Sequence, residues 1–158
     1  MSTAKSLSVA QYILDRCNEL GDPAVTPMQL IKLVYVAHGY MLGKYSRPLL
    51  DEPVQAWQYG PVVPTVYRAV KDYQSAPVER VAGAVQGAVF SDKEREVMDN
   101  VARTYGKYTG IVLSSATHRP GTPWHRTWEL AGKNAPISND LIENFYANML
   151  QQPPHSGL

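Results

Sequence analysis

Ser114 and His118 stand four positions apart, a spacing that could support nucleophilic chemistry. On a helix this spacing places a hydroxyl and an imidazole on one face, within reach of each other. Neither a Gly-x-Ser-x-Gly turn nor a recognisable orienting carboxylate accompanies the two residues. Serine and histidine near a helix end more often hydrogen-bond the last carbonyl groups, and we favour that structural role here.

Other chemistry finds less support in the residue types. Cys17 falls on the apolar face of a predicted helix, so core packing is its expected role. His118 and His125 are separated by a Pro-Gly turn, and neither CxxC nor HExxH occurs, so no metal site is predicted. Neither a P-loop nor a dinucleotide-binding fingerprint is present. We therefore predict no catalytic residue, no metal and no cofactor, and expect that the protein is not an enzyme.

The segment at residues 118–128 concentrates cations and aromatic rings. Its arginines and tryptophans could contact phosphates and stack on bases, so a nucleic-acid-binding regulator is the alternative function. With 15 Lys+Arg against 14 Asp+Glu, the formal net charge of +1 makes nucleic acid an improbable partner. We favour a tight turn between helices in which Trp124 and Trp128 fill the core while Arg119 and Arg126 stay in water.

A second unusual segment is the aromatic and proline-rich corner at residues 57–64. Tryptophan and tyrosine anchor many protein interfaces, and a strand edge here could pair with another chain. Alternatively, Trp57 and Tyr59 point into the core while Gly60-Pro61 turns the chain. The sequence leaves these two interpretations open.

The elements that must position these residues are mostly helices. Helix starts are predicted at Ser8 with Gln11, Thr26-Pro27 with Gln29, Ser91 with Glu94, Thr109, Thr122-Pro123 and Ser138. The helix after Thr26 is apolar almost all round, as expected of a buried central helix. A further helix is predicted over Thr65 to about Tyr73, with Pro64 able to sit in its first turn and Tyr67 among its apolar positions.

Residues 54–59 alternate in the manner of a short strand, which Gly60-Pro61 is expected to end. The stretch from Ser75 to Val89 reads as a loop or a poorly specified strand. The fold class predicted is therefore mainly α: a compact multi-helix domain around a central apolar helix, with one small strand element near residues 54–59.

Length and composition limit the organisation. With 158 residues, 44% of them hydrophobic, the chain is expected to form a single domain over residues 1–150, followed by a flexible C-terminal tail at 151–158. The single cysteine and the lack of a run of roughly twenty apolar residues favour a cytoplasmic setting and no membrane partner. Ten tyrosines and three tryptophans, with only 18% charged residues, suggest that part of the surface meets a partner.

Several motifs together resemble one family. They are Leu30-Ile31-Lys32-Leu33-Val34-Tyr35-Val36-Ala37-His38-Gly39, Pro48-Leu49-Leu50, Ala56-Trp57-Gln58-Tyr59-Gly60-Pro61-Val62, Leu113-Ser114-Ser115-Ala116-Thr117-His118, Pro123-Trp124 and a closing helix from Ile137 to Leu150. In this order they resemble the Panacea domain family of SocA-like and GepA-like antitoxins. The resemblance runs from about Ser6 to Met149, and residues 75–89 are its unmatched part.

The resemblance implies an antitoxin of a bacterial or phage toxin–antitoxin system, without enzymatic activity. Family members are encoded beside unrelated toxins and neutralise them by direct contact, and some act as adaptors that present the toxin to a protease. The expected partners are thus a cognate toxin protein and, for an adaptor, a protease such as a Clp-type complex. The oligomeric state is not predicted.

The candidate partner-binding or motif residues are Lys32, Tyr35, His38, Trp57, Tyr59, Gly60, Pro61, Val62, Tyr67, His118 and Trp124. Whether each serves the fold or the toxin is left open by the resemblance. Because loops vary most among relatives, we expect the toxin-specific surface in the loops 75–89 and 48–53.

Overall fold

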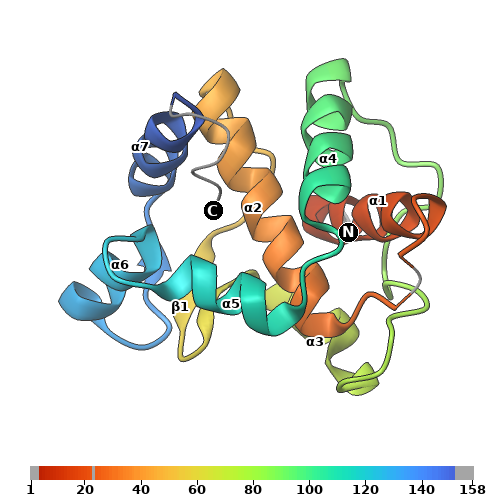
Figure 1. Ribbon diagram of the computed structural model, residues 1–158, viewed down its shortest axis with the longest axis horizontal. Helices are drawn as coiled ribbons and strands as arrows, with labels where there is room; N and C mark the ends of the chain where they lie inside the picture. The colour runs from red at the N-terminus through yellow and green to blue at the C-terminus, as the bar shows by residue number, and fades with distance from the viewer. Residues whose placement is uncertain (1–3, 23, 152–158) are drawn as a thin grey trace.

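Helix α2 (Pro27–Tyr45) runs through the middle of the molecule, with the other helices arranged around it (Figure 1). The structure is a computed structural model and describes residues 4–22 and 24–151. Thr26 caps α2 with a complete capping box to Gln29, and Pro27 occupies the first turn, as predicted. Every side chain from Gln29 to Leu42 is buried, which confirms the central apolar helix.

The remaining elements of the described chain follow in order. They are α1 (Lys5–Glu19), β1 (Val54–Trp57), β2 (Gly60–Val62), α3 (Pro64–Val70), the 3-10 helix η1 (Lys71–Tyr73), α4 (Asp92–Tyr105), α5 (Gly110–His118), α6 (Pro123–Ala131), β3 (Pro136–Ile137) and α7 (Asn139–Leu150). Helices α1, α4, α5 and α7 all pack on α2. The fold is therefore mainly α, as the sequence predicts.

The small strand element is a three-stranded antiparallel sheet of order β2-β1-β3. Strands β1 and β2 form a hairpin in which Trp57 pairs with Gly60 across the turn residues Gln58 and Tyr59. The prediction that Gly60-Pro61 ends the strand element is wrong, because both residues belong to β2. A proline is tolerated there because β2 lies at the edge of the sheet.

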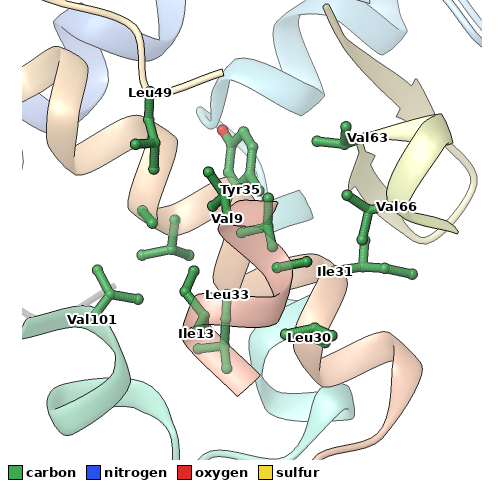
Figure 2. Close-up of a cluster of buried hydrophobic side chains, with 14 of the residues drawn as sticks. Val9, Ile13, Leu30, Ile31, Leu33, Tyr35, Leu49, Val63, Val66 and Val101 are labelled. Atoms are coloured by element: carbon green, nitrogen blue, oxygen red, sulfur yellow. The ribbon is translucent and has the colours of Figure 1, made fainter. Parts of the chain in front are cut away.

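One apolar core joins the helices to the hairpin. Figure 2 shows side chains from α1, α2, α4 and the segment after the hairpin converging, among them Val9, Leu33, Val66 and Val101. Helices α2 and α7 approach closely at Gly43, where a Cβ atom would lie 2.8 Å from the backbone of α7. The lack of a side chain at this position allows the close approach. Burial of this apolar surface is the main stabilising contribution to the fold.

The start of the first helix differs from the prediction. Helix α1 begins at Lys5 rather than after Ser8, and the expected capping box does not form. The Ser8 hydroxyl instead accepts a hydrogen bond from the Val85 N–H at 3.1 Å, in the loop that covers α1. The closing helix begins at Asn139 with Ser138 as its cap, as the residues predict. The start at Ile137 that the family resemblance implies is wrong, because Ile137 pairs with Val54 in the sheet.

The other boundaries agree with the sequence. Capping by Ser91, Thr109, Thr122 and Ser138 is confirmed. The helix that begins at Pro64 ends as an α-helix at Val70 and tightens into η1, which reaches the predicted end at Tyr73. Residues 75–89 form a loop without a strand. Residues 152–158 of the predicted tail lie outside the described residues. Within the described ranges, no helix is long and apolar enough to cross a membrane.

Candidate partner-binding site

Side chains from three helices hold the backbone of the hairpin. The indole Nε1 of Trp124 on α6 donates a hydrogen bond to the carbonyl of Trp57 at 2.6 Å. The Ser114 hydroxyl on α5 donates to the carbonyl of Tyr59 at 2.5 Å. The Lys32 ammonium group on α2 donates to the carbonyl of Pro61 at 2.8 Å. The three acceptors are alternate residues along the hairpin. Motif residues far apart in the sequence thus meet at one short segment and fix its position.

Gly60 is required where the hairpin meets α2 and α5. Its φ of +120° is unfavourable for other residues. A Cβ atom there would lie 2.9 Å from the Lys32 ammonium nitrogen and 3.4 Å from the Thr117 hydroxyl oxygen. Pro61 and Val62, which follow, are buried. This part of the motif therefore serves close packing of the hairpin.

Lys32 is a buried cation with one hydrogen bond. The residue is only 2% exposed, and no carboxylate of the described residues forms an ion pair with it. Desolvation by burial lowers the pKa of Lys32 to about 7. A lysine in such surroundings is costly to keep charged, since nothing of opposite charge compensates for the lost water.

His38 and Tyr35 belong to the core. The Nδ1 atom of His38 accepts from the backbone N–H groups of Leu49 and Leu50, at 3.3 and 3.2 Å. The proton therefore sits on Nε2, which donates to the Asn139 side chain at 3.0 Å. Burial lowers the pKa of His38, which favours this neutral form. The Tyr35 ring packs edge-on against Tyr146. Neither motif residue is available to a partner at the surface.

Ser114 and His118 do not form a nucleophile–base pair. The Ser114 hydroxyl donates to Tyr59, and the His118 Nδ1 atom hydrogen-bonds the backbone carbonyl of Ser114. The predicted structural role is therefore confirmed. Burial raises the pKa of the Cys17 thiol to about 11, which makes it a poor nucleophile at neutral pH. Across residues 4–22 and 24–151, no three His, Cys, Asp or Glu side chains are grouped to hold a metal ion.

The turn at residues 118–128 has the structural arrangement favoured from the sequence, except that Trp128 is only half-buried. Trp124 is buried, and Trp128 stacks on it with ring centroids 5.1 Å apart and planes at 20°. Arg119 and Arg126 are exposed. Because Trp124 is buried and Trp128 covers one of its faces, Trp124 is not available to stack on a base.

The outer side of the hairpin borders a groove of about 630 Å³. We call it the hairpin groove; its lining residues are Pro27, Met28, Ile31, Lys32, Trp57, Gln58, Tyr59, Val62, Tyr67, Lys71, Gln74, Lys133 and Asn134. Trp57 and Tyr67 meet edge to face across 4.9 Å and form one aromatic wall. Tyr59, 62% exposed, stands at the turn, so the interpretation in which it points into the core is wrong.

A second hollow of about 420 Å³ adjoins the first. Met28 and Tyr59 line both, and Ile111 of α5, which is 78% exposed, lines the second. We call the five side chains Met28, Trp57, Tyr59, Tyr67 and Ile111 the hairpin surface. Large apolar side chains grouped in this way mark protein interaction sites. In Figure 1 the hairpin lies at the strand labelled β1, beside α5.

The hairpin surface combines predicted and unpredicted residues. Trp57, Tyr59 and Tyr67 are sequence candidates, whereas Met28 and Ile111 are not. An isolated exposed methionine or isoleucine gives no signal in a sequence, because single apolar residues are common on surfaces. Their significance comes from α2 and α5 placing them beside the hairpin turn.

The loop at residues 75–89 lies over α1. Its Val78 and Val81 are buried, and the Val81 N–H donates to the Gln11 side chain at 2.8 Å. The loop lines a separate hollow of about 520 Å³, which shares no residue with the hairpin groove. A toxin-specific role for this loop and for residues 48–53 stays a prediction.

Comparison with known proteins finds the same family that the motifs resemble. Residues 30–125 match the family described as antitoxin SocA-like, Panacea domain. The chain is 29% identical over 128 residues to antitoxin SocA of Caulobacter vibrioides (strain NA1000 / CB15N), an alignment covering 74% of this chain and 66% of that protein. The chain thus spans just under two thirds of that relative's length. No solved structure matches. The matched range contains Lys32, the hairpin, α5 and Trp124.

Proposed function

Because the chain belongs to the antitoxin SocA-like, Panacea domain family, we propose that it is an antitoxin that neutralises its toxin in the cytoplasm by direct, stoichiometric binding through the hairpin surface. The observation that carries this proposal is the grouping of exposed aromatic and aliphatic side chains around the hairpin turn. Tyrosine and tryptophan are enriched among the residues that supply most of the binding energy in protein interfaces, and methionine is enriched in interfaces as well.

The way the hairpin is held supports a binding role. Three side-chain donors fix alternate carbonyl groups of the hairpin, so its turn is positioned before any partner arrives. A surface that is ordered in advance loses little conformational entropy on binding, and this favours affinity. Neutralisation by contact needs such a surface and needs no reactive group, which agrees with the engaged side chains of Ser114 and His118.

The test is co-expression with the product of the adjacent gene. We expect that expressing the neighbouring protein alone arrests growth, that co-expression with this chain restores growth, and that the two proteins co-purify. A stable toxin level in rescued cells indicates masking, whereas a toxin level that falls only when a Clp-type protease is present indicates an adaptor. A harmless neighbour that does not co-purify would overturn the antitoxin proposal.

Variants localise the interface. Tyr59→Ala and Ile111→Asp remove exposed side chains of the hairpin surface, so each should weaken the complex at least about tenfold with little change in folding stability. Leu130→Asp is the matched control, because Leu130 is 88% exposed on α6 and lies outside the hairpin surface. Unchanged binding in both hairpin variants would place the interface elsewhere.

A further inference from the structure

The floor of the hairpin groove contains a cation whose hydrogen-bonding capacity is mostly unused. The Lys32 ammonium group has three N–H donors, and one of them goes to the Pro61 carbonyl. Among the described residues it has no second hydrogen bond and no ion pair, although it is 2% exposed and lines the groove. A buried donor without an acceptor is unfavourable, so an acceptor entering the groove would gain a strong interaction.

The charges around the groove have one sign. Lys71 and Lys133 line it together with Lys32, and none of its lining residues is an aspartate or glutamate. A negatively charged group is therefore attracted to the groove and meets no like charge there.

The walls of the groove are apolar. Met28, Ile31, Trp57, Val62 and Tyr67 line it, and its volume of about 630 Å³ accommodates several side chains of a partner. These walls exclude water and lower the local dielectric constant, which strengthens attraction between Lys32 and an anion. A group that fits both features has an anionic oxygen flanked by apolar side chains.

We propose that the hairpin groove binds a segment of the toxin in which an aspartate or glutamate lies between apolar side chains, and that this carboxylate pairs with the Lys32 ammonium group. The inference rests on the antitoxin function proposed above and assigns the chemistry of its partner. It also gives Lys32 a second role, because the same ammonium group fixes the hairpin through Pro61 and receives the toxin.

Proton uptake accompanies such binding. The pKa of Lys32 is about 7 in the free protein, and a carboxylate beside it raises that pKa. Above pH 7 the protein must therefore take up a proton to bind, and affinity falls as the pH rises. Five titratable or charged side chains lie near Lys32. They are Tyr59 of the hairpin, Tyr67 of α3, Lys71 of η1, His118 of α5 and Lys133, which follows α6.

The experiment uses a phage-displayed library of random peptides panned on the folded protein, because such peptides offer side-chain carboxylates without a free C-terminus. We expect the selected peptides to carry aspartate or glutamate next to apolar residues. A synthetic copy of the best peptide should bind at least about tenfold more tightly than its copy with Asp→Asn or Glu→Gln. Selected peptides without a carboxylate, or equal affinities for acid and amide, would overturn the inference.

Lys32→Met tests the cation directly, with Lys93→Met as a control on the exposed surface of α4. Lys32→Met should lower affinity for the acidic peptide at least about tenfold more than it lowers affinity for the amide peptide, because both peptides lose the hairpin support through Pro61 and only the acidic one loses a charge partner; Lys93→Met should change neither. If Lys32→Met does not fold, the pairing is tested by the affinity of the natural protein for the acidic peptide at several pH values. This affinity should fall between about pH 7 and about pH 9, and an affinity that does not change with pH contradicts the pairing.

The two proposals can fail separately. A toxin complex that forms and is insensitive to Lys32→Met leaves the antitoxin function intact and overturns the role of the groove. A neighbouring protein that neither arrests growth nor binds removes the antitoxin function, whatever peptides the groove selects.

Discussion

The indole Nε1 of Trp124 donates a hydrogen bond of 2.6 Å to the carbonyl oxygen of Trp57, so two tryptophans that are 67 positions apart connect α6 to the hairpin. The ring of Trp57 in turn meets Tyr67 of α3. A continuous contact therefore runs from α6 through the hairpin to α3. The orientation of the exposed hairpin turn depends on residues that are themselves buried.

Replacing Trp124 by phenylalanine keeps an aromatic ring and removes the donor. The Trp57 carbonyl then loses its side-chain partner, so we expect Trp124→Phe to lower the free energy of unfolding by about 1–3 kcal/mol. Trp128→Phe is the control, since Trp128 stacks on Trp124 and is only half-buried. Urea denaturation of both variants measures the difference, and equal losses would show that the hydrogen bond contributes nothing measurable.

Lys32 makes the stability of the protein depend on pH in a defined direction. Its pKa is about 7 in the folded state against an ordinary value of 10.5, so between these values the unfolded chain binds more protons. The free energy of unfolding should therefore rise with pH across this window. Relative to Lys32→Met, the natural protein should gain up to about 1.4 kcal/mol per pH unit between about pH 7 and about pH 9. Urea denaturation of both proteins at several pH values checks this, and a pH-independent difference contradicts it.

The local signals of the sequence predict the fold well. The capping boxes at Thr26 and Ser91 form as expected, because a cap involves residues only three positions apart. Ser8 misleads because its hydroxyl is used by Val85, 77 positions away, and no local pattern reports such a partner. Likewise, the pairing of Ile137 with Val54 places a strand where the family resemblance implies the start of the closing helix.

The candidate site is only partly predictable for the same reason. The aromatic corner at Trp57 and Tyr59 stands out in the sequence, but its exposure depends on how α5 and α6 hold the hairpin. Lys133 and Lys71 join Lys32 at the hairpin groove from separate segments. Their convergence is a property of tertiary packing, and the residue types by themselves give no sign of it.

His38 gives a second pH-dependent prediction, at lower pH. Burial lowers its pKa below the ordinary value of 6.5, so under acidic conditions the unfolded chain takes up a proton that the folded protein excludes. The free energy of unfolding should thus fall as the pH drops below about 6.5, by at most about 1.4 kcal/mol per unit from this residue. His38→Gln retains an acceptor without titrating, so its stability should fall less. Thermal unfolding of both proteins between about pH 7 and about pH 5 tests this, and parallel curves would exclude His38 as the cause.

A pair of glycine substitutions separates backbone strain from packing at the hairpin. Gly60 and Gly121 both have positive φ values, +120° and +86°, so an alanine is strained at either position. At Gly121 the new Cβ atom meets nothing within 4 Å, whereas at Gly60 it lies 2.9 Å from the Lys32 ammonium nitrogen.

We therefore expect Gly121→Ala to lower the free energy of unfolding by about 1 kcal/mol and Gly60→Ala by about 2–3 kcal/mol, because Gly60→Ala also displaces the buried lysine. Toxin binding should weaken in Gly60→Ala alone, since the displaced Lys32 releases the Pro61 carbonyl and the hairpin turn shifts. Urea denaturation and co-purification with the toxin measure the two effects. If both variants lose the same stability and bind equally well, the contact between Gly60 and Lys32 does not position the hairpin.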